Sequence, residues 1–392
     1  MKTNNLFRLS FWKSVSAIVI IVGLYSIISR FALGLGKTTN LSDLVPWGLW
    51  IGFDFIGVGL AAAGFTIAAT AHIFNAHKYH SIVRPAILTA YIGYIIVILL
   101  LIIDLGKPQN FWHPLVMWNL HSVMFEITWC VICYSTILTL EFAPIILEKF
   151  NLKAPIELLR KVSIPVVICG VLFSTLHQSS FGSLYLIAPA KVYPLWYSSY
   201  LPVHFFISCI AAGLSMIIFE AYLCARAFRQ GLKVWVLSGL GKVILTVLSI
   251  ELVFKFSDLI LNGKSAYLFL PIQETYFFWL EIIIGSIIPI AILSIPGYIN
   301  DRKWLYFASI FTISGFVLNR MNVSITSLVR TSGQNYAPSF YEISITLLLV
   351  VLGMWAFRLI TKNFKVFETS FELNSEAVET ADLKQRELIF GK

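Results

Sequence analysis

Charged residues are scarce in this chain of 392 residues: Asp, Glu, Lys and Arg make up 12% of it, and hydrophobic residues make up 58%. A soluble domain carries about a quarter of its residues as charged side chains. The scarcity excludes an ordinary soluble fold and predicts an all-α polytopic membrane protein. The net charge of +9 does not indicate a nucleic-acid partner, because the basic residues are spread along short loops.

Cysteine is also scarce, and its placement argues against a metal centre. The five cysteines all lie inside apolar runs: Cys130, Cys133, Cys169, Cys209 and Cys224. Cys130 and Cys133 have CxxC spacing, but no second pair accompanies them. The five cysteines are therefore better interpreted as small apolar side chains. No CxxCxxCxxxC run for an iron–sulfur cluster is present either.

Histidines that could hold a haem are few. A membrane cytochrome b needs two histidines facing each other across helices for each haem. Only His121, His177 and His204 are predicted at outer span ends. One outer haem stays open, but the pattern favours no haem, and electrons would then come from a partner or a diffusible carrier.

Long apolar runs, by contrast, are abundant. Because about 20 apolar residues cross the hydrocarbon core, ten spans are predicted, at 12–33, 47–73, 85–104, 119–146, 162–178, 200–226, 234–262, 274–297, 303–321 and 341–360. The first is too long for the core of a signal peptide and lacks a small-residue cleavage site, so we expect a span. Residues 1–361 then form the transmembrane domain, and 362–392 form a polar cytoplasmic tail.

Basic residues divide unequally between the two sets of loops. One set holds Lys2, Arg8, Lys13, Lys78, Arg84, Lys149, Lys153, Arg160, Lys161, Arg226, Arg229, Lys233, Arg302, Lys303, Arg358, Lys362 and Lys365. The other set holds Arg30, Lys37, Lys107, Lys191, Lys264, Arg320 and Arg330. Cytoplasmic loops carry the excess of Lys and Arg, so both termini are predicted on the cytoplasmic side of the cytoplasmic (inner) membrane.

One polar stretch, TLHQSSFGSLYLI at 175–187, interrupts otherwise apolar sequence at the predicted outer end of the fifth span. Polar groups are inexpensive in water and costly in lipid. A cluster of them at one helix end therefore suggests a ligand pocket near the outer face. The alternative is a helix end whose serines cap the next segment.

Ionisable side chains inside the predicted spans form a second group of candidates: Asp54, Glu126, Glu220, Lys242, Glu251, Lys255, Asp258 and Glu281. Such groups are costly in lipid and mark functional sites. Glu251, Lys255 and Asp258 fall on one helix face, and their spacing also allows a triad that neutralises its own charges. If the acidic groups converge, with Glu251 near the middle, they could form a stepwise path for protons.

A possible internal repeat relates 47–178 to 200–321. Each part begins with a span that enters from the outer side and carries small residues, GVGLAAAGF at 57–65 and AAGLSMIIF at 211–219. The repeat would give two four-helix bundles plus flanking helices. Generic packing through small residues is the alternative explanation.

Several stretches together resemble a known family. They are PWGLWIGFDFIGVGLAAAGF (46–65), DLGKP (104–108), HSVMFEITWC (121–130), LHQSSFGSLYLI (176–187) and VYPLWYSSYLPVHFFIS (192–208). These resemble the NrfD/PsrC/HybB family, the polysulfide reductase C-like membrane subunits that interact with quinones. The number of spans and the LHQSS stretch look most like the HybB branch, the membrane subunit of certain nickel–iron hydrogenases. Membrane subunits of sulfate-reducer redox complexes are a close alternative.

The resemblance implies a fold, a ligand and partners. It implies a pair of four-helix bundles without haem, which bind menaquinone or ubiquinone near the outer face. An extracytoplasmic iron–sulfur subunit of the four-cluster, ferredoxin-like type would lie beside the site, with further catalytic or cytochrome subunits. A departure is Val192 before Tyr193-Pro194, where the family often has histidine.

Site residues follow from the resemblance position by position. His177 would match a quinone-site histidine and Tyr91 an important tyrosine of the third span. Glu126 and Glu220 would match acids of proton transfer, with Glu251 deeper on the same expected path. Two further residues, Asp104 and His121, lie in motif stretches on the quinone side.

Quinone reduction takes two electrons and two protons, and it needs donors at both carbonyls. His177 suits one carbonyl, because an unperturbed histidine exchanges a proton near working pH. Gln178, Ser179 and Ser180 could hold the other. Trp47 and Trp50 could flank the ring, and anchoring at the membrane interface is the alternative for both.

Two other functions remain open on the sequence. A secondary transporter is one, but such proteins usually have helices broken by Gly or Pro in matching halves, and spans three, four and seven are uninterrupted. A passive anchor for soluble subunits is the other, and it would leave the buried carboxylates unexplained.

Overall fold

The computed structural model describes residues 11–72, 79–228 and 234–367. All regular elements in these ranges are helices, and nine are long and apolar enough to cross a membrane. The predicted all-α polytopic membrane fold is confirmed. Lys2, Arg8, Lys78, Arg229, Lys233 and the tail from 368 lie outside the described residues.

Nine apolar spans match nine of the ten predicted ones. They are Phe11–Leu33, Leu49–Thr70, Ile82–Asp104, Val123–Lys149, Ser163–Leu186, Leu201–Ala227, Val234–Leu261, Gln273–Ser294 and Phe340–Asn363. The predicted span at 303–321 is the helix α15 (Arg302–Met321), which continues through a π-helical turn, η6 (Asn322–Thr326), into α16 (Ser327–Ser332). It is less apolar than the others because it carries Arg302, Lys303, Asn319 and Arg320.

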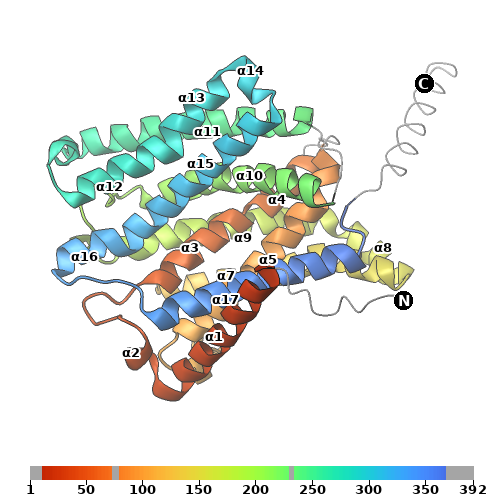
Figure 1. Ribbon diagram of the computed structural model, residues 1–392, viewed down its shortest axis with the longest axis horizontal. Helices are drawn as coiled ribbons and strands as arrows, with labels where there is room; N and C mark the ends of the chain where they lie inside the picture. The colour runs from red at the N-terminus through yellow and green to blue at the C-terminus, as the bar shows by residue number, and fades with distance from the viewer. Residues whose placement is uncertain (1–10, 73–78, 229–233, 368–392) are drawn as a thin grey trace.

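The long helices pack as two bundles with two flanking helices, as predicted (Figure 1). The first bundle comprises α3 (Leu49–Ala61) with α4 (Ala63–His72), α5 (His80–Asp104), α7 (Val123–Lys149) and α9 (Ser163–Leu186). The second comprises α10 (Leu201–Phe228), α11 (Val234–Leu261), α12 (Gln273–Ile282) with η5 (Ile283–Ile287) and α13 (Ile288–Ser294), and α15. The internal sequence repeat itself stays a prediction.

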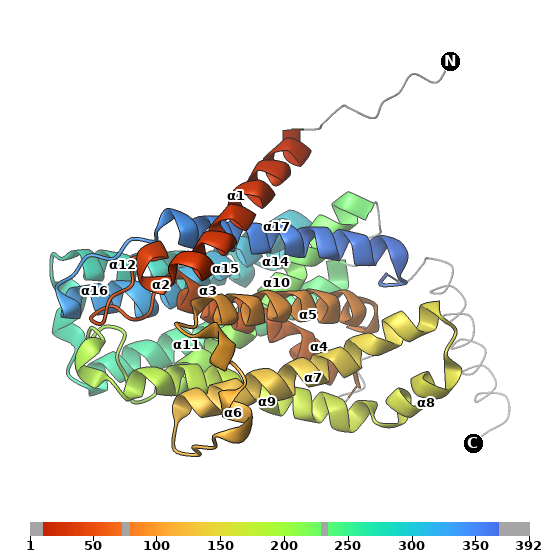
Figure 2. The ribbon, with the colours of Figure 1, turned by 90° about the horizontal axis from the view of Figure 1, so that it is seen from below.

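Helices α1 (Phe11–Leu33) and α17 (Phe340–Asn363) pair with each other, and α17 rests against α5 of the first bundle. Figure 2 shows the N-terminal half of α1 leaving the bundle obliquely. One polar contact anchors its other end: the buried Arg30 guanidinium donates to the carbonyls of Ile103 at 3.0 Å and Leu105 at 2.8 Å. Arg30 is thus not the loop charge that the sequence suggested.

Short helices complete the connections. They are α2 (Leu35–Thr38), η2 (Pro108–Asn110), α6 (His113–Val116), α8 (Lys153–Lys161), η3 (Pro189–Lys191), η4 (Ser265–Phe269) and α14 (Pro296–Ile299). After α17 the chain docks against α5 and α7, where Val366 is 1% exposed and Arg84 donates to the Lys365 carbonyl at 3.0 Å. The first described residues of the predicted polar tail therefore belong to the packed domain.

The predicted end of the fifth span at 178 is wrong, since α9 continues to Leu186. The polar stretch 175–187 lies within this helix up to its last turn. Two of its serine hydroxyls lie within hydrogen-bond reach of carbonyls one turn back: Ser180 Oγ is 2.7 Å from the Leu176 oxygen, and Ser183 donates to the Ser179 carbonyl at 3.2 Å. Such back-bonding lets polar residues continue a helix that a sequence pattern would end.

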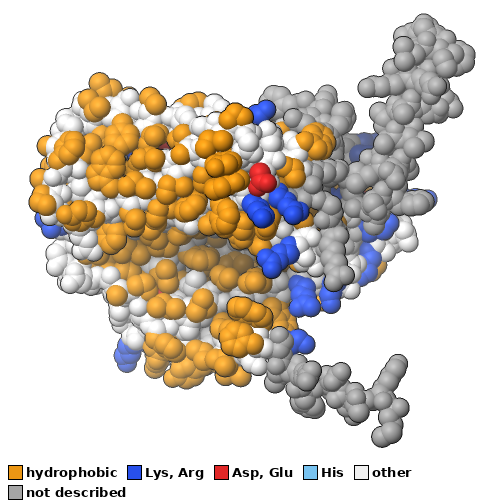
Figure 3. Space-filling model, turned by 45° about the horizontal axis from the view of Figure 1, so that its top comes forward, with side chains coloured by type: hydrophobic (Ala, Val, Ile, Leu, Met, Phe, Trp, Pro, Cys, Tyr) orange, Lys and Arg blue, Asp and Glu red, His pale blue; other side chains and the backbone are white. Residues whose placement is uncertain are grey.

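The outer surface of the helices fits a lipid environment. Figure 3 shows a broad hydrophobic face, with most of its Lys and Arg side chains gathered toward the right-hand end. Large apolar side chains such as Ile18, Val253 and Leu359 are more than half exposed. Lipid rather than water is the medium that stabilises such a surface.

Candidate functional site

His177 is fully buried in the first bundle. Its Nδ1 atom shares a short hydrogen bond with the hydroxyl of Tyr94 on α5. The imidazole lies 4.4 Å from the Phe181 ring, and Tyr94 in turn lies 4.6 Å from the Tyr134 ring. The Nε2 atom of His177 has no hydrogen-bond partner within the described chain. This nitrogen is therefore left for a ligand or water.

Gln178 and Tyr185 are seven residues apart on one face of α9. Both are buried, and neither the Gln178 amide nor the Tyr185 hydroxyl has a hydrogen-bond partner in the described residues. Trp47, just before α3, meets Tyr185 edge-on with the ring centroids 5.2 Å apart. Three buried side chains of α9, those of His177, Gln178 and Tyr185, therefore carry unsatisfied polar atoms, which is uncommon in a packed interior.

Asp54 and Glu126 complete the polar groups of the first bundle. Asp54 on α3 is 2% exposed, and its Oδ1 atom has no partner among the described residues. Glu126 in the first turn of α7 is exposed, and Ser180 donates to it at 2.7 Å. That bond joins α7 to the polar stretch of α9, so the two motif stretches meet in space.

Other predicted site residues lie further from His177. Tyr91 stacks on Phe142 with the centroids 5.0 Å apart, and the tyrosine that meets His177 is Tyr94, one turn along α5. Asp104 is half-buried at the end of α5, and His121 is exposed before α7. Ser179 is half-buried, and within the described residues no hydrogen bond of its hydroxyl links it to His177.

The second bundle contains a buried carboxylate with four donors. Glu281 accepts hydrogen bonds from Lys255 Nζ at 3.3 Å, Trp196 Nε1 at 3.1 Å, Asn319 Nδ2 at 3.1 Å and Asn322 Nδ2 at 2.8 Å. The alternative of a self-neutralising triad on α11 is not what the structure shows, because Lys255 pairs across helices with Glu281. Trp196 is 4% exposed, so it serves this network and does not anchor the chain at the interface.

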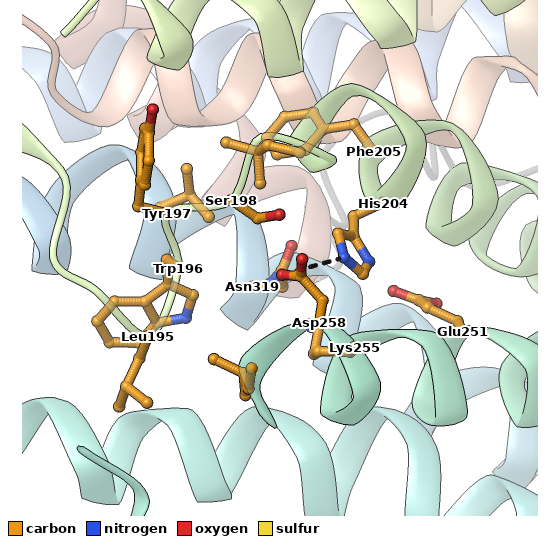
Figure 4. Close-up of a pocket in the computed structure, with 13 residues that line it drawn as sticks. Leu195, Trp196, Tyr197, Ser198, His204, Phe205, Glu251, Lys255, Asp258 and Asn319 are labelled. Atoms are coloured by element: carbon orange, nitrogen blue, oxygen red, sulfur yellow. Dashed lines mark ion pairs between the residues drawn. The ribbon is translucent and has the colours of Figure 1, made fainter. Parts of the chain in front are cut away.

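A small polar pocket, with room only for water-sized groups, lies beside this network, between α10, α11 and the loop before α10. His204 and Asp258 face each other across it at 3.9 Å, as Figure 4 shows. Glu251 and Lys255 line both this pocket and a second small one on the other side of Asn319. The Glu251 carboxylate accepts no hydrogen bond within the described residues, so it is left to water or a ligand.

Arg320 lies between the two bundles. It is 1% exposed, and its guanidinium covers the Phe205 ring at 3.7 Å and donates to the Ser208 hydroxyl at 2.8 Å. Its Nε atom has no partner in the described part of the chain. The sequence suggested a loop charge here, because an arginine so near the end of a less apolar helix gives no sign of facing inward.

Glu220 is separated from both groups. It is buried on α10, 16 positions after His204, and at 1.5 Å per residue that is about 24 Å along the helix. No hydrogen bond in the described residues links it to Glu251 or Glu281. The single converging path expected from the sequence is therefore not continuous in this conformation.

The residues of these networks that escaped the sequence-based site are Tyr94, Tyr185, Trp196, Asn319, Arg320 and Asn322. Tyr94 could have been found from its place one turn after Tyr91, on nearly the same face of the same helix. Asn322 carried no signal beyond its polarity, because its role depends on a π-helical turn that periodicity does not reveal.

Two four-helix bundles that enclose buried histidines, carboxylates and an arginine define a polytopic membrane protein with internal polar sites, a class that serves redox coupling or transport. The chain belongs to the polysulphide reductase NrfD family, whose model matches residues 37–331.

Three relatives cover most of the chain. A protein of Nitratidesulfovibrio vulgaris is 37% identical over 90% of this chain and 93% of its own. The probable Ni/Fe-hydrogenase 2 b-type cytochrome subunit of Escherichia coli K12 is 32% identical over 86% and 88%. The integral membrane subunit of menaquinone reductase from Nitratidesulfovibrio vulgaris is 28% identical over 90% of each chain.

Proposed function

We propose that this protein is the quinone-binding membrane subunit of a multi-subunit respiratory redox complex. It exchanges electrons between an extracytoplasmic iron–sulfur subunit of the four-cluster, ferredoxin-like type and the menaquinone or ubiquinone pool of the cytoplasmic membrane. Further catalytic or cytochrome subunits complete the complex. The family and the names of the hydrogenase and menaquinone reductase relatives support this assignment.

The observation that carries the proposal is the set of unpartnered polar atoms on α9: His177 Nε2, both amide atoms of Gln178 and the Tyr185 hydroxyl. Burying a polar group without a hydrogen bond costs about 1–3 kcal/mol. Several such groups on one helix are therefore stabilised when a ligand with polar ends binds there. A quinone has two carbonyls on a flat apolar ring, and the surrounding aromatic side chains supply an apolar wall.

Each residue then has a role at the ring. His177 binds one carbonyl through Nε2, and Tyr94 holds the other nitrogen and so sets the orientation of the imidazole. The Gln178 amide and Tyr185 hydroxyl bind the second carbonyl, with Ser179 beside them. Trp47 covers the outer end of the site through Tyr185. Three further residues lie outside this group: Asp104 and His121 on the approach to the site, and Tyr91 on its deeper side.

Proton transfer is assigned to Glu126, Glu220 and Glu251. Glu126 is bonded to the polar stretch through Ser180 and is exposed, so it can exchange protons between the site and water. Glu251 lines both polar pockets and has no hydrogen bond within the described chain. Glu220 serves the opposite end of α10, and ordered water would have to bridge the gap between them.

A haem fits these residues poorly, although one relative carries "b-type cytochrome" in its name. Axial ligation needs two histidines that face each other. The His177 ring is held by Tyr94 at Nδ1, and the His204 ring faces Asp258. Each histidine is oriented by its own partner in its own bundle. The described residues also contain no group of three or more His, Cys, Asp or Glu that could hold a metal ion.

The first test replaces His177 with alanine in the intact complex. Turnover linked to a naphthoquinol analogue should fall to background, while the chain still inserts and its partner subunits still co-purify. His204→Ala is the matched variant in the second bundle and should retain quinol binding. Unchanged turnover in His177→Ala, or loss of binding only in His204→Ala, would move the quinone away from α9.

Two further experiments distinguish the proposed function from a passive anchor and from a secondary transporter. A passive anchor predicts that quinone-linked activity survives neutral replacement of Glu126 and Glu220. A secondary transporter predicts solute uptake by liposomes that contain this chain alone. The proposed function predicts loss of activity in the first experiment and no uptake in the second.

A further inference from the structure

One buried carboxylate joins three separate segments at the outer end of the molecule. Glu342, in the first turn of α17, is 0% exposed. It accepts a short hydrogen bond from the Tyr336 hydroxyl, and bonds from the backbone N–H groups of Ser339 at 2.8 Å and Asn40 at 3.3 Å. We call Asn40, Tyr336, Ser339 and Glu342 the outer clamp.

The clamp holds two loops together that are about 300 residues apart in sequence. Ser339 donates to the Thr38 carbonyl at 2.6 Å, and the Asn40 side chain donates to the Ala337 carbonyl at 2.8 Å. Figure 1 shows both loops at the same end of the molecule, the red one before α3 and the blue one before α17. Several bonds with a buried acceptor at their centre fix the relative position of the loops.

Tyr336 extends the clamp to the first turn of α3. Its hydroxyl accepts the N–H of Leu49 at 2.9 Å, one of the donors that a helix start leaves without a partner. The approach depends on glycine, because a Cβ atom on Gly48 would lie 2.3 Å from the Tyr336 oxygen. Trp50 adds a bond from its indole N–H to the Glu342 carbonyl at 3.3 Å.

Burial raises the pKa of Tyr336 above its ordinary value. The hydroxyl therefore stays protonated at working pH and keeps donating to Glu342 while it accepts from Leu49. A tyrosine can fill both roles at once, whereas a phenylalanine can fill neither.

We propose that Tyr336 is a positioning residue for the outer site: it holds the Trp47–Gly48–Leu49 turn so that Trp47 covers Tyr185 on α9. This rests on the proposed function for its effect on turnover, but not for its effect on the turn. Tyr336, Ser339 and Glu342 lie beyond residues 37–331, which the family model matches. The flanking pair α1 and α17 thereby gains a role at the site, which lies in the first bundle.

The test uses Tyr336→Phe in the full complex, with Tyr276→Phe as the control, since Tyr276 is 65% exposed and its hydroxyl has no bond in the described chain. Loss of the two hydrogen bonds of the Tyr336 hydroxyl should raise the KM for a naphthoquinol analogue about fivefold, with kcat nearly unchanged. Hydrogen exchange should show faster exchange of the Leu49 amide in Tyr336→Phe only. Gly48→Ala, which displaces the Tyr336 hydroxyl, should reproduce both effects.

The outcomes are distinguishable. Unchanged Leu49 exchange in Tyr336→Phe would overturn the clamp whatever the activity. Faster exchange with unchanged KM would overturn its positioning role at the site. A fall in kcat together with a lower unfolding temperature would indicate a general structural role and would also overturn it. If the unaltered complex binds no naphthoquinol, the proposed function fails, and the exchange measurement still decides whether the clamp exists.

Discussion

At the scale of single residues, the two buried polar networks differ in how well they are satisfied. Glu281 has four donors, whereas Glu251 accepts no hydrogen bond in the described chain and His177, Gln178 and Tyr185 keep unpartnered atoms. A fully bonded carboxylate rigidifies its surroundings. Unsatisfied groups are where a ligand or water gains most by binding. We therefore assign structure to Glu281 and chemistry to the residues on α9.

Glu281→Ala tests that division. It leaves Lys255, Trp196, Asn319 and Asn322 without their acceptor, and breaking a buried ion pair costs on the order of 3 kcal/mol. The midpoint of thermal unfolding in detergent should fall clearly. Glu157→Ala, at an exposed position on α8, is the control and should leave it unchanged. An unaltered midpoint in Glu281→Ala would show that the network adds no net stability.

At the scale of elements, the second bundle depends on a very close helix crossing. The π-helical turn η5 follows the helix of Glu281, and there Gly285 meets Gly315 of α15. A Cβ atom on Gly315 would lie 1.9 Å from the Gly285 Cα atom. Small residues permit such an approach, which brings the side chains of Asn319 and Asn322 within reach of Glu281.

Gly315→Ala should destabilise the protein by about 3 kcal/mol or more, because backbone atoms have to separate. Gly93→Ala is the matched control within a span: nothing lies within 4 Å of its added Cβ atom, and alanine favours the helix by up to about 1 kcal/mol. Yield and thermal midpoint of the two purified variants give the comparison. Equal behaviour would mean that the crossing opens without cost.

At the scale of the whole molecule, the burial of two arginines that the sequence placed in outer loops strengthens the prediction of the orientation. Arg30 and Arg320 are buried in helices, which leaves the outer loops with Lys37, Lys107, Lys191, Lys264 and Arg330. Burial also lowers the pKa of Lys264, and the ammonium donates to the Tyr197 carbonyl at 2.6 Å. The imbalance of basic residues between the two sides is therefore larger than the sequence count indicated.

Both termini are therefore expected in the cytoplasm. A C-terminal fusion to green fluorescent protein should fluoresce in the host, and a fusion to alkaline phosphatase at the same position should be inactive. A phosphatase fusion within the loop after α5 should be active and serves as the control. The opposite pattern of activities would invert the orientation and place the α9 site on the cytoplasmic side.

The sequence by itself determined the class and most of the spans, because the cost of placing charge and bare backbone in lipid acts on composition alone. It also pointed to His177, Gln178 and the buried acids, since polar groups in apolar runs need no structure to be noticed.

Only the tertiary structure decided which of these groups meet. The pairing of Lys255 with Glu281, the bond between Tyr94 and His177, and the inward turn of Arg320 depend on helix rotation and crossing. Helix periodicity specifies which residues share a face but not which helix that face meets. The clamp around Glu342 is even harder to predict from the sequence, because its loops become neighbours only when α1 and α17 pair.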